Sequence, residues 1–127
     1  MKYLIDTDIL IDHLRGEFKP TAFLQKVEEG QFQAAISVIT EYELLAATKL
    51  KESEIIKIER LIELMPRLAI TSQTVKIAAR FHRNYRTDMA DALIAATAFV
   101  ANATLITRNL RHFQNIRELH AQGVPSH

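Results

Sequence analysis

Carboxylates follow apolar stretches of this 127-residue chain at three separate places. They are Asp6 and Asp8 near the start, Glu41 and Glu43 in the first half, and Asp88 and Asp91 further along. If a fold brought these acids together, they would repel one another and raise each other's pKa unless a cation lay between them. Oxygen ligands in a chain without Cys favour Mg²⁺ or Mn²⁺, which can orient and acidify a water beside a phosphodiester. These residues therefore predict hydrolytic metal chemistry.

Helix capping is a simpler explanation for each acid taken singly. Thr40–Glu43 has the pattern of a capping box, and Asp88 and Asp91 suit the cap and first turn of a helix. Asp8 and Asn109 are each placed to cap the turn that follows them. Capping therefore stays open as an alternative for every one of these positions.

Asp91 argues for more than capping. The predicted helix Met89–Asn102 is apolar nearly all round, so it should be buried. An unpaired carboxylate at the base of a buried helix is costly, because it loses its hydration. We therefore expect a positive group to face Asp91.

Strand and helix patterns alternate along the chain. Predicted strands are Lys2–Ile5, Ala34–Ser37, Leu68–Ile70 and Thr104–Thr107. The first predicted helix starts near Asp8, and Gly16 and Pro20 end that unit. A long helix is predicted from Thr40, and the helix Glu52–Met65 is stopped by Pro66. The other predicted helices are Thr21–Glu29, Val75–Asn84 and Met89–Asn102. Such alternation predicts an α/β fold, with a parallel sheet covered by helices on both faces. Ligands of such sheets bind beyond the carboxyl ends of the strands, where the acids and the turn Thr107–Asn109 would meet.

Composition predicts one globular domain, residues 1–127, because 48% of the residues are apolar and 24% are charged. The absence of Cys suits a reducing cytoplasm. The start does not resemble a signal peptide, and no apolar run reaches the roughly 20 residues of a membrane span. We therefore expect a cytoplasmic protein without a membrane segment.

The later half of the chain carries an excess of positive charge. Residues 76–120 contain seven Lys or Arg and three Asp or Glu, although the net charge of the whole chain is only +1. A basic surface attracts a polyanion such as RNA, and the residues predicted to contact phosphate are Arg83, Arg86, Arg108 and Arg111. Charge alone favours the simpler interpretation, an ordinary solvated helix face. The five His, which are His13, His82, His112, His120 and His127, form no close pair at metal-ligand spacing, and a surface position is favoured for His112 over a phosphate contact.

Four segments of this chain resemble the PIN-domain family, and within it the VapC-like toxin branch of bacterial toxin–antitoxin pairs. They are Tyr3–Asp12, Ile36–Leu44, Ala90–Ala98 and Leu105–Phe113, in the family's order. The resemblance implies a PIN-like three-layer fold with about five parallel strands. It also implies cleavage of single-stranded RNA that leaves a 5′ phosphate, a cognate antitoxin and a homodimer.

The same resemblance implies roles for individual residues. Asp6, Glu43 and Asp91 match the acids that hold Mg²⁺ or Mn²⁺ and carry catalysis. Asp8 and Thr107 take supporting roles. Asn109 stands where a fourth acid often occurs, which leaves the number of metal ions open.

Other functions remain as alternatives. A strand followed by Asp6-Thr7-Asp8 also resembles an aspartyl phosphotransferase of the haloacid-dehalogenase type, and a receiver domain likewise gathers acids around Mg²⁺. Both need a Lys from a late turn, and no Lys follows Lys76. The third alternative is a PIN-like module that binds RNA without cutting it.

Overall fold

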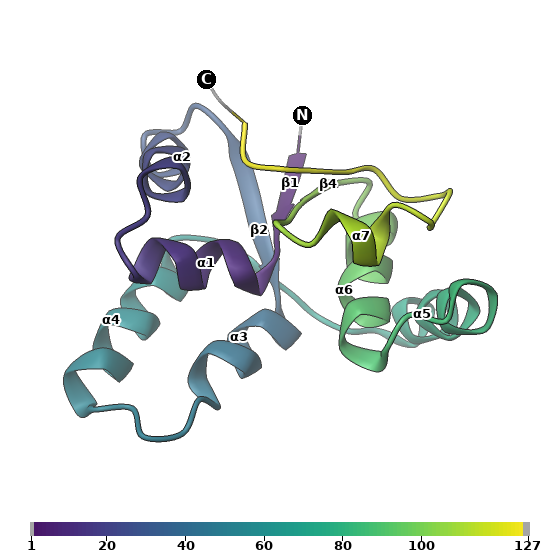
Figure 1. Ribbon diagram of the computed structural model, residues 1–127, viewed down its shortest axis with the longest axis horizontal. Helices are drawn as coiled ribbons and strands as arrows, with labels where there is room; N and C mark the ends of the chain where they lie inside the picture. Colours follow the sequence, from purple (N-terminus) through teal and green to yellow (C-terminus); the bar gives the residue numbers. More distant parts are fainter. Residues whose placement is uncertain (1, 126–127) are drawn as a thin grey trace.

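The protein is described by a computed structural model that covers residues 2–125. Within this range a five-stranded, fully parallel sheet lies between two layers of helices (Figure 1). The strands are β1 (Lys2–Ile5), β2 (Gln33–Ser37), β3 (Arg67–Leu68), β4 (Thr104–Ile106) and β5 (Ala121–Gln122), in the order β3-β2-β1-β4-β5. The predicted α/β fold with a parallel sheet is therefore confirmed.

Alternation along β1 divides the core into two layers. Tyr3 and Ile5 point to one face of the sheet and Leu4 to the other, because successive side chains of a strand leave opposite faces. On the first face lie α1 (Thr7–Leu14), α2 (Phe18–Glu28), α3 (Val38–Leu45) and α4 (Glu52–Glu63). On the second lie α5 (Ser72–Tyr85), α6 (Met89–Val100) and α7 (Leu110–Phe113). Figure 1 shows the two groups to the left and right of the strands.

The β2–α3 junction differs from the sequence prediction. α3 is a short helix that ends at Leu45, and the long helix predicted from Thr40 does not form. Ser37, not Thr40, is its N-cap, since the Ser37 hydroxyl accepts a hydrogen bond from the backbone N–H of Ile39 at 3.0 Å. The capping box predicted for Thr40–Glu43 is therefore wrong, and this leaves both side chains free for tertiary contacts.

Two further boundaries differ for local reasons. α2 begins at Phe18 and contains Pro20 in its first turn, where the missing N–H costs no intrahelical bond, so Pro20 does not end the preceding unit. β3 begins at Arg67 and ends at Leu68, earlier than the predicted Leu68–Ile70. The residue patterns predicted neither α7 nor β5, which have four and two residues, too few for a periodic signal.

The carboxyl ends of β1, β2 and β4 lie at one edge of the sheet, because the three strands pair in parallel. The N-termini of α1 and α3 leave directly from this edge. Of the helices in residues 2–125, none is long and apolar enough to span a membrane.

Candidate active site

Asp6 stands at the junction of β1 and α1, with its side chain almost fully buried at 5% exposure. It is the N-cap of α1, in extended conformation, and its Oδ1 accepts a hydrogen bond from the backbone N–H of Thr7 at 2.8 Å. The Thr107 hydroxyl, at the end of β4, donates to Asp6 Oδ2 at 2.7 Å. Both carboxylate oxygens are thus fixed, one by the first residue of α1 and the other by the residue that follows β4.

Burial makes the charged form of Asp6 unfavourable. Desolvation raises the pKa of Asp6 from 3.8 to about 7, with smaller contributions from the charges of Asp8 and Asp91, against the hydrogen bonds from Thr107 and Thr7. A cation beside this carboxylate would stabilise its ionised form.

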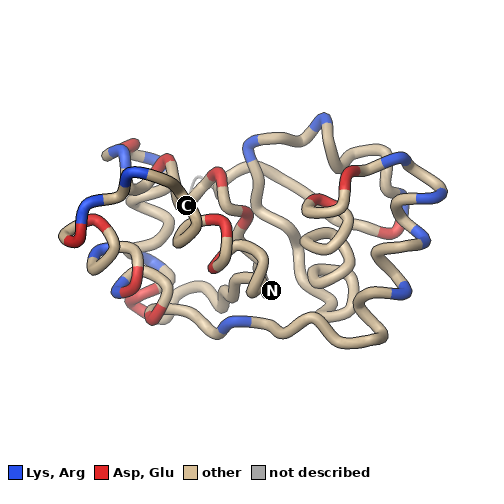
Figure 2. The backbone as a smooth tube through the Cα atoms, turned by 90° about the horizontal axis from the view of Figure 1, so that it is seen from below, with Lys and Arg blue, Asp and Glu red and all other residues tan. Residues whose placement is uncertain are grey.

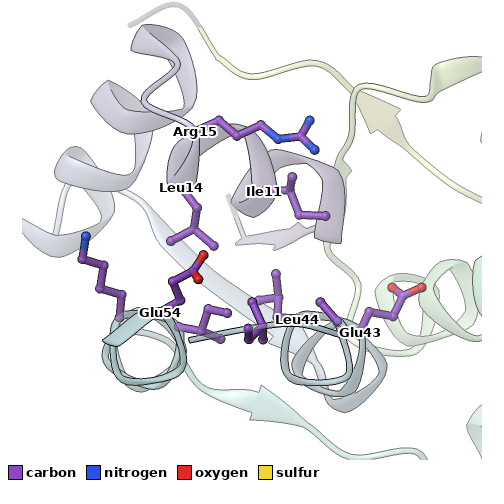
Figure 3. Close-up of a pocket in the computed structure, with 10 residues that line it drawn as sticks. Ile11, Leu14, Arg15, Glu43, Leu44 and Glu54 are labelled. Carbon is purple, nitrogen blue, oxygen red and sulfur yellow. The ribbon is translucent and has the colours of Figure 1, made fainter. Parts of the chain in front are cut away.

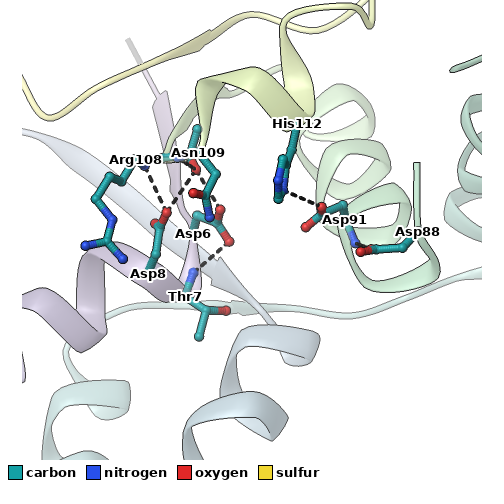
Figure 4. Close-up of polar contacts among 9 residues, drawn as sticks. Asp6, Thr7, Asp8, Asp88, Asp91, Arg108, Asn109 and His112 are labelled. Atoms are coloured by element: carbon teal, nitrogen blue, oxygen red, sulfur yellow. Dashed lines mark hydrogen bonds and ion pairs between the residues drawn. The ribbon is translucent and has the colours of Figure 1, made fainter. Parts of the chain in front are cut away.

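Asp8 is held by the turn that follows β4 (Figure 4). Its Oδ2 accepts a hydrogen bond from the backbone N–H of Arg108 at 3.0 Å, and the Thr107 hydroxyl lies 3.4 Å away. The guanidinium of Arg108 pairs instead with Asp12, at 3.1 Å. Burial raises the pKa of Asp8, and the Arg108 contacts oppose this. Asp6 takes the capping position predicted for Asp8, so that prediction was wrong.

Glu43 approaches the same edge from α3. Its side chain is exposed, and its Oε1 accepts a hydrogen bond of 2.6 Å from the Thr7 hydroxyl. Thr7 therefore contacts Asp6 through its backbone and Glu43 through its side chain.

Asp91 lies in the first turn of α6, after the N-cap Asp88, whose Oδ1 accepts from the backbone N–H of Asp91 at 2.9 Å. The cap predicted at Asp88 is thus confirmed. Asp91 Oδ2 lies 3.1 Å from Nδ1 of His112 on α7, which is the group that faces Asp91 (Figure 4). Burial, followed by the charge of Asp88, raises the pKa of Asp91, and His112 opposes this.

The remaining predicted residues are distributed around these acids. Asn109 takes the predicted N-cap position of α7, but its side chain makes no capping hydrogen bond, and its backbone N–H donates to the Thr107 hydroxyl at 3.0 Å. Arg86 and Arg111 line a hollow together with Asp91 and His112. Arg83 lines a different, apolar hollow between α5 and α6, with Val75, Met89 and Leu93. His127 lies outside the described residues.

Positively and negatively charged residues are unevenly distributed over the fold. Figure 2 shows Lys and Arg along the outer rim of the half formed by α5 to α7, at the right of the view, whereas both signs mix in the half formed by α1 to α4. The excess of positive charge predicted for residues 76–120 thus lies on one side of the molecule.

The residues fit a hard divalent cation in donor chemistry. Within residues 2–125, no three His, Asp or Glu side chains lie close enough, as they stand, to share one ion. However, Asp6 is a buried carboxylate with no basic side chain bonded to it in this range, and Asp8 Oδ1 is buried without a hydrogen-bond partner. Both observations suit a cation near Asp6, with Glu43 held by the adjoining residue Thr7 and Asp91 able to turn towards the cation because its side chain reaches solvent.

Sequence reasoning missed the contacts that four residues make at or beside the site. Thr7 gave no signal beyond its place in the chain, Thr40 was predicted only as a helix cap, and His112 was assigned to the surface rather than to Asp91. Asp12 did carry a signal, since it stands four residues after Asp8 and therefore on the same face of α1.

An apolar groove runs beside the acids, between α1, α3 and α4 (Figure 3). It has a volume of about 410 Å³. Its apolar lining includes Ile11, Leu14, Leu44 and Ile58. Glu43 lies at one end of the groove and Glu54 at the other, so the groove leads to the acidic centre.

The family model described as PIN domain matches residues 3–119. The chain therefore belongs to the PIN-domain family, which excludes the phosphotransferase and receiver alternatives. A curated relative, Ribonuclease VapC19 of Mycobacterium tuberculosis, is 37% identical over 121 residues, covering 91% of this chain and 95% of the relative.

Solved structures agree with the fold. VapBC-1 from nontypeable Haemophilus influenzae contains a chain that is 27% identical, with a TM-score of 0.80 and coverage of 97% of this chain and 98% of that one. VapBC2 from Rickettsia felis, bound to a DNA fragment from its promoter, contains a chain with a TM-score of 0.85 at 22% identity, covering 97% and 98% of the two chains. At that identity the likeness concerns the fold alone.

Proposed function

We propose that residues 1–127 form one PIN domain that cleaves RNA phosphodiester bonds in a divalent-metal-dependent reaction, as the toxin of a toxin–antitoxin pair. The observation that carries this proposal is the approach of three acids to one edge of the sheet: Asp6 from the N-cap of α1, Glu43 from α3 and Asp91 from the first turn of α6. Besides the larger effect of burial, the charge of Asp91 raises the pKa of Asp6, and the charge of Glu43 raises the pKa of Asp91. The relative named Ribonuclease VapC19 supports the assignment to RNA.

Asp6, Glu43 and Asp91 would hold Mg²⁺ or Mn²⁺, which when bound supplies an acidified water and stabilises charge on the phosphoryl oxygens. Thr107 fixes Asp6 Oδ2, and the turn Thr107–Arg108 fixes Asp8, so these residues keep the carboxylates in place. Asn109 and Asp8 take supporting roles at the same edge.

RNA would reach the acids across the hollow lined by Arg86 and Arg111. Their positive charge attracts phosphates and offsets the repulsion between the acids and the RNA backbone. Arg108 borders the acids from the other side but already pairs with Asp12, and Arg83 lies off this route because it lines the separate hollow between α5 and α6.

Two protein partners complete the proposal. The apolar groove of Figure 3 supports an antitoxin that covers Ile11, Leu14 and Leu44 and so blocks access to Glu43. The hollow between α5 and α6, with Val75 and Met89 exposed, supports a homodimer through this second apolar face.

The test is cleavage of RNA by the purified protein with and without chelator. We expect activity to vanish in EDTA and to return with Mg²⁺ or Mn²⁺. Glu63→Gln, an exposed acid at the end of α4, is the matched control for loss of a negative charge and should remain active. Full-rate cleavage in EDTA would contradict the metal mechanism. Tight RNA binding without cleavage under any metal would favour the non-catalytic module.

A further inference from the structure

Glu43 is unusual among the three acids because it projects from an exposed position of a short helix. A glutamate there has several rotatable bonds, and fixing it in one orientation costs conformational entropy. Nevertheless its Oε1 makes a contact of only 2.6 Å, with the Thr7 hydroxyl on another element. A side chain from the β1–α1 junction thus selects one orientation of Glu43.

Thr7 is itself fixed by a second threonine. Its hydroxyl oxygen lies 3.0 Å from that of Thr40, which is completely buried on α3. Thr40 precedes Glu43 by three residues, so both project from the same face of α3 towards Thr7. The three side chains therefore form one continuous chain of hydrogen bonds between α1 and α3.

The number of hydroxyl protons decides which hydrogen bond Thr7 donates. A threonine hydroxyl carries one proton, whereas a carboxylate oxygen only accepts. The Thr7 hydroxyl is placed to donate to Thr40 at 3.0 Å and to Glu43 at 2.6 Å, and its single proton goes to the shorter contact, with the carboxylate of Glu43. Hydrogen bonds to a carboxylate are about twice as strong as those between neutral groups, which favours this arrangement.

We infer that Thr7 is a positioning residue that holds the Glu43 carboxylate towards Asp6 through its hydroxyl, with Thr40 fixing Thr7 in turn. The inference deepens the proposed function, on which its metal-binding consequence rests. The backbone N–H of Thr7 bonds Asp6 Oδ1, so the same residue sets the relation between two of the three acids. Groups that orient metal ligands in this way typically contribute about 10- to 100-fold to metal affinity.

Thr7→Val tests the inference, since valine has the shape of threonine and keeps the backbone N–H to Asp6 but lacks the hydroxyl. Thr7→Ser retains the donor. Thr97→Val is the matched control, because the buried Thr97 hydroxyl donates to the backbone oxygen of Leu93 at 2.7 Å, away from the acids. Thermal unfolding of each variant checks that the fold is retained.

The first measurement needs no metal. Scalar couplings of the Glu43 side chain, measured by NMR in the presence of EDTA, report whether it occupies one rotamer or several. We expect one rotamer in the wild type, in Thr7→Ser and in Thr97→Val, and averaging in Thr7→Val and Thr40→Val. Unchanged couplings in Thr7→Val would overturn the inference.

The second measurement is Mn²⁺ affinity in the absence of RNA. We expect Thr7→Val to weaken it about 10- to 100-fold, with Thr7→Ser and Thr97→Val like the wild type. In a Glu43→Gln background, Thr7→Val should cause no further loss, and an equal loss there would show that Thr7 does not act through Glu43. A wild-type protein that binds no Mn²⁺ would contradict the proposed function, whereas the couplings would still decide the role of Thr7.

Discussion

Asp6 and Asp91 belong to the same candidate site but are built in different ways. Asp6 is 5% exposed and both its oxygens are bonded, to the Thr7 backbone and to the Thr107 hydroxyl. The Asp91 side chain is 22% exposed and its contact outside its own helix is with the half-exposed His112. Asp6 is thus part of the core, whereas Asp91 can reorient without disturbing it. A site with one fixed and one adjustable acid can be preformed and still close around a ligand.

Neutralising each acid in turn should have the largest effect and should separate the roles of Asp6 and Asp91. Asp6→Asn and Asp91→Asn should both reduce RNA cleavage by about a thousandfold or more, because losing one of three ligands removes several kcal/mol of transition-state stabilisation. Their effects on stability should differ. In EDTA, Asp6→Asn should raise the free energy of unfolding by roughly 1–2 kcal/mol, since it removes a buried charge that lacks a cation. Asp91→Asn should change it by less than about 0.5 kcal/mol.

Urea unfolding and cleavage assays on the same samples check both parts. If Asp91→Asn unfolds the protein, Asp91 serves the fold and the difference between the two acids disappears. If Asp6→Asn keeps wild-type cleavage, Asp6 does not hold the metal.

The basic residues at the rim of the site also differ in their surroundings. Arg111 shares a hollow with Asp91, Arg108 is already paired with Asp12, and Arg83 lines the hollow between α5 and α6. In an inactive Asp6→Asn background, Arg111→Ala should weaken RNA binding and lower the salt slope by about 0.7, the value for one phosphate of a single strand. Arg108→Ala should have a smaller effect and Arg83→Ala the smallest.

Filter binding across a salt series measures these slopes. Equal affinities and parallel slopes for wild type and Arg111→Ala would remove this hollow from the RNA path. A larger loss for Arg83→Ala than for Arg111→Ala would move the path to the other side of α5.

The smallest expected effect concerns an acid whose pKa shifts in the opposite direction to that of Asp6. The Tyr85 hydroxyl donates to Glu118 at 2.6 Å and lowers the pKa of Glu118 below 4.5, with Arg80 a further contact at 3.5 Å. Because the folded pKa is below the unfolded one, this stabilisation is present above pH 4.5 and is lost as pH falls through the lowered value. Tyr85→Phe should therefore destabilise the protein slightly at pH 7, and the difference should vanish in acid.

The same pair predicts a change at high pH. The Glu118 contact raises the pKa of Tyr85 above 10, so its contribution is also lost as pH rises through that raised value. Thermal unfolding of wild type and Tyr85→Phe between pH 3 and pH 11 checks both limits. A constant difference across the whole range would show that the pair contributes through packing rather than through ionisation.

Sequence reasoning predicted the elements whose signal is local. The alternation of apolar segments gave the parallel sheet, and the apolar helix after Asp88 gave α6 with its cap. It did not predict the short elements, because two to four residues carry no period. It also assigned the β2–α3 cap to Thr40 instead of Ser37, since both are good capping residues and the tertiary contact with Thr7 decides between them.

By itself, the sequence determined which residue types follow each strand, and hence that acids from β1, β2 and the start of α6 would share an edge, because parallel pairing brings strand ends together. Only the tertiary structure decided what each acid contacts. Hydrogen bonds such as Thr107 to Asp6, 101 residues apart, depend on the register of β1 against β4, and no local pattern encodes that register. The same holds for His112 opposite Asp91 and for Thr7 beside Glu43, where packing of separate elements brings the partners within hydrogen-bond distance.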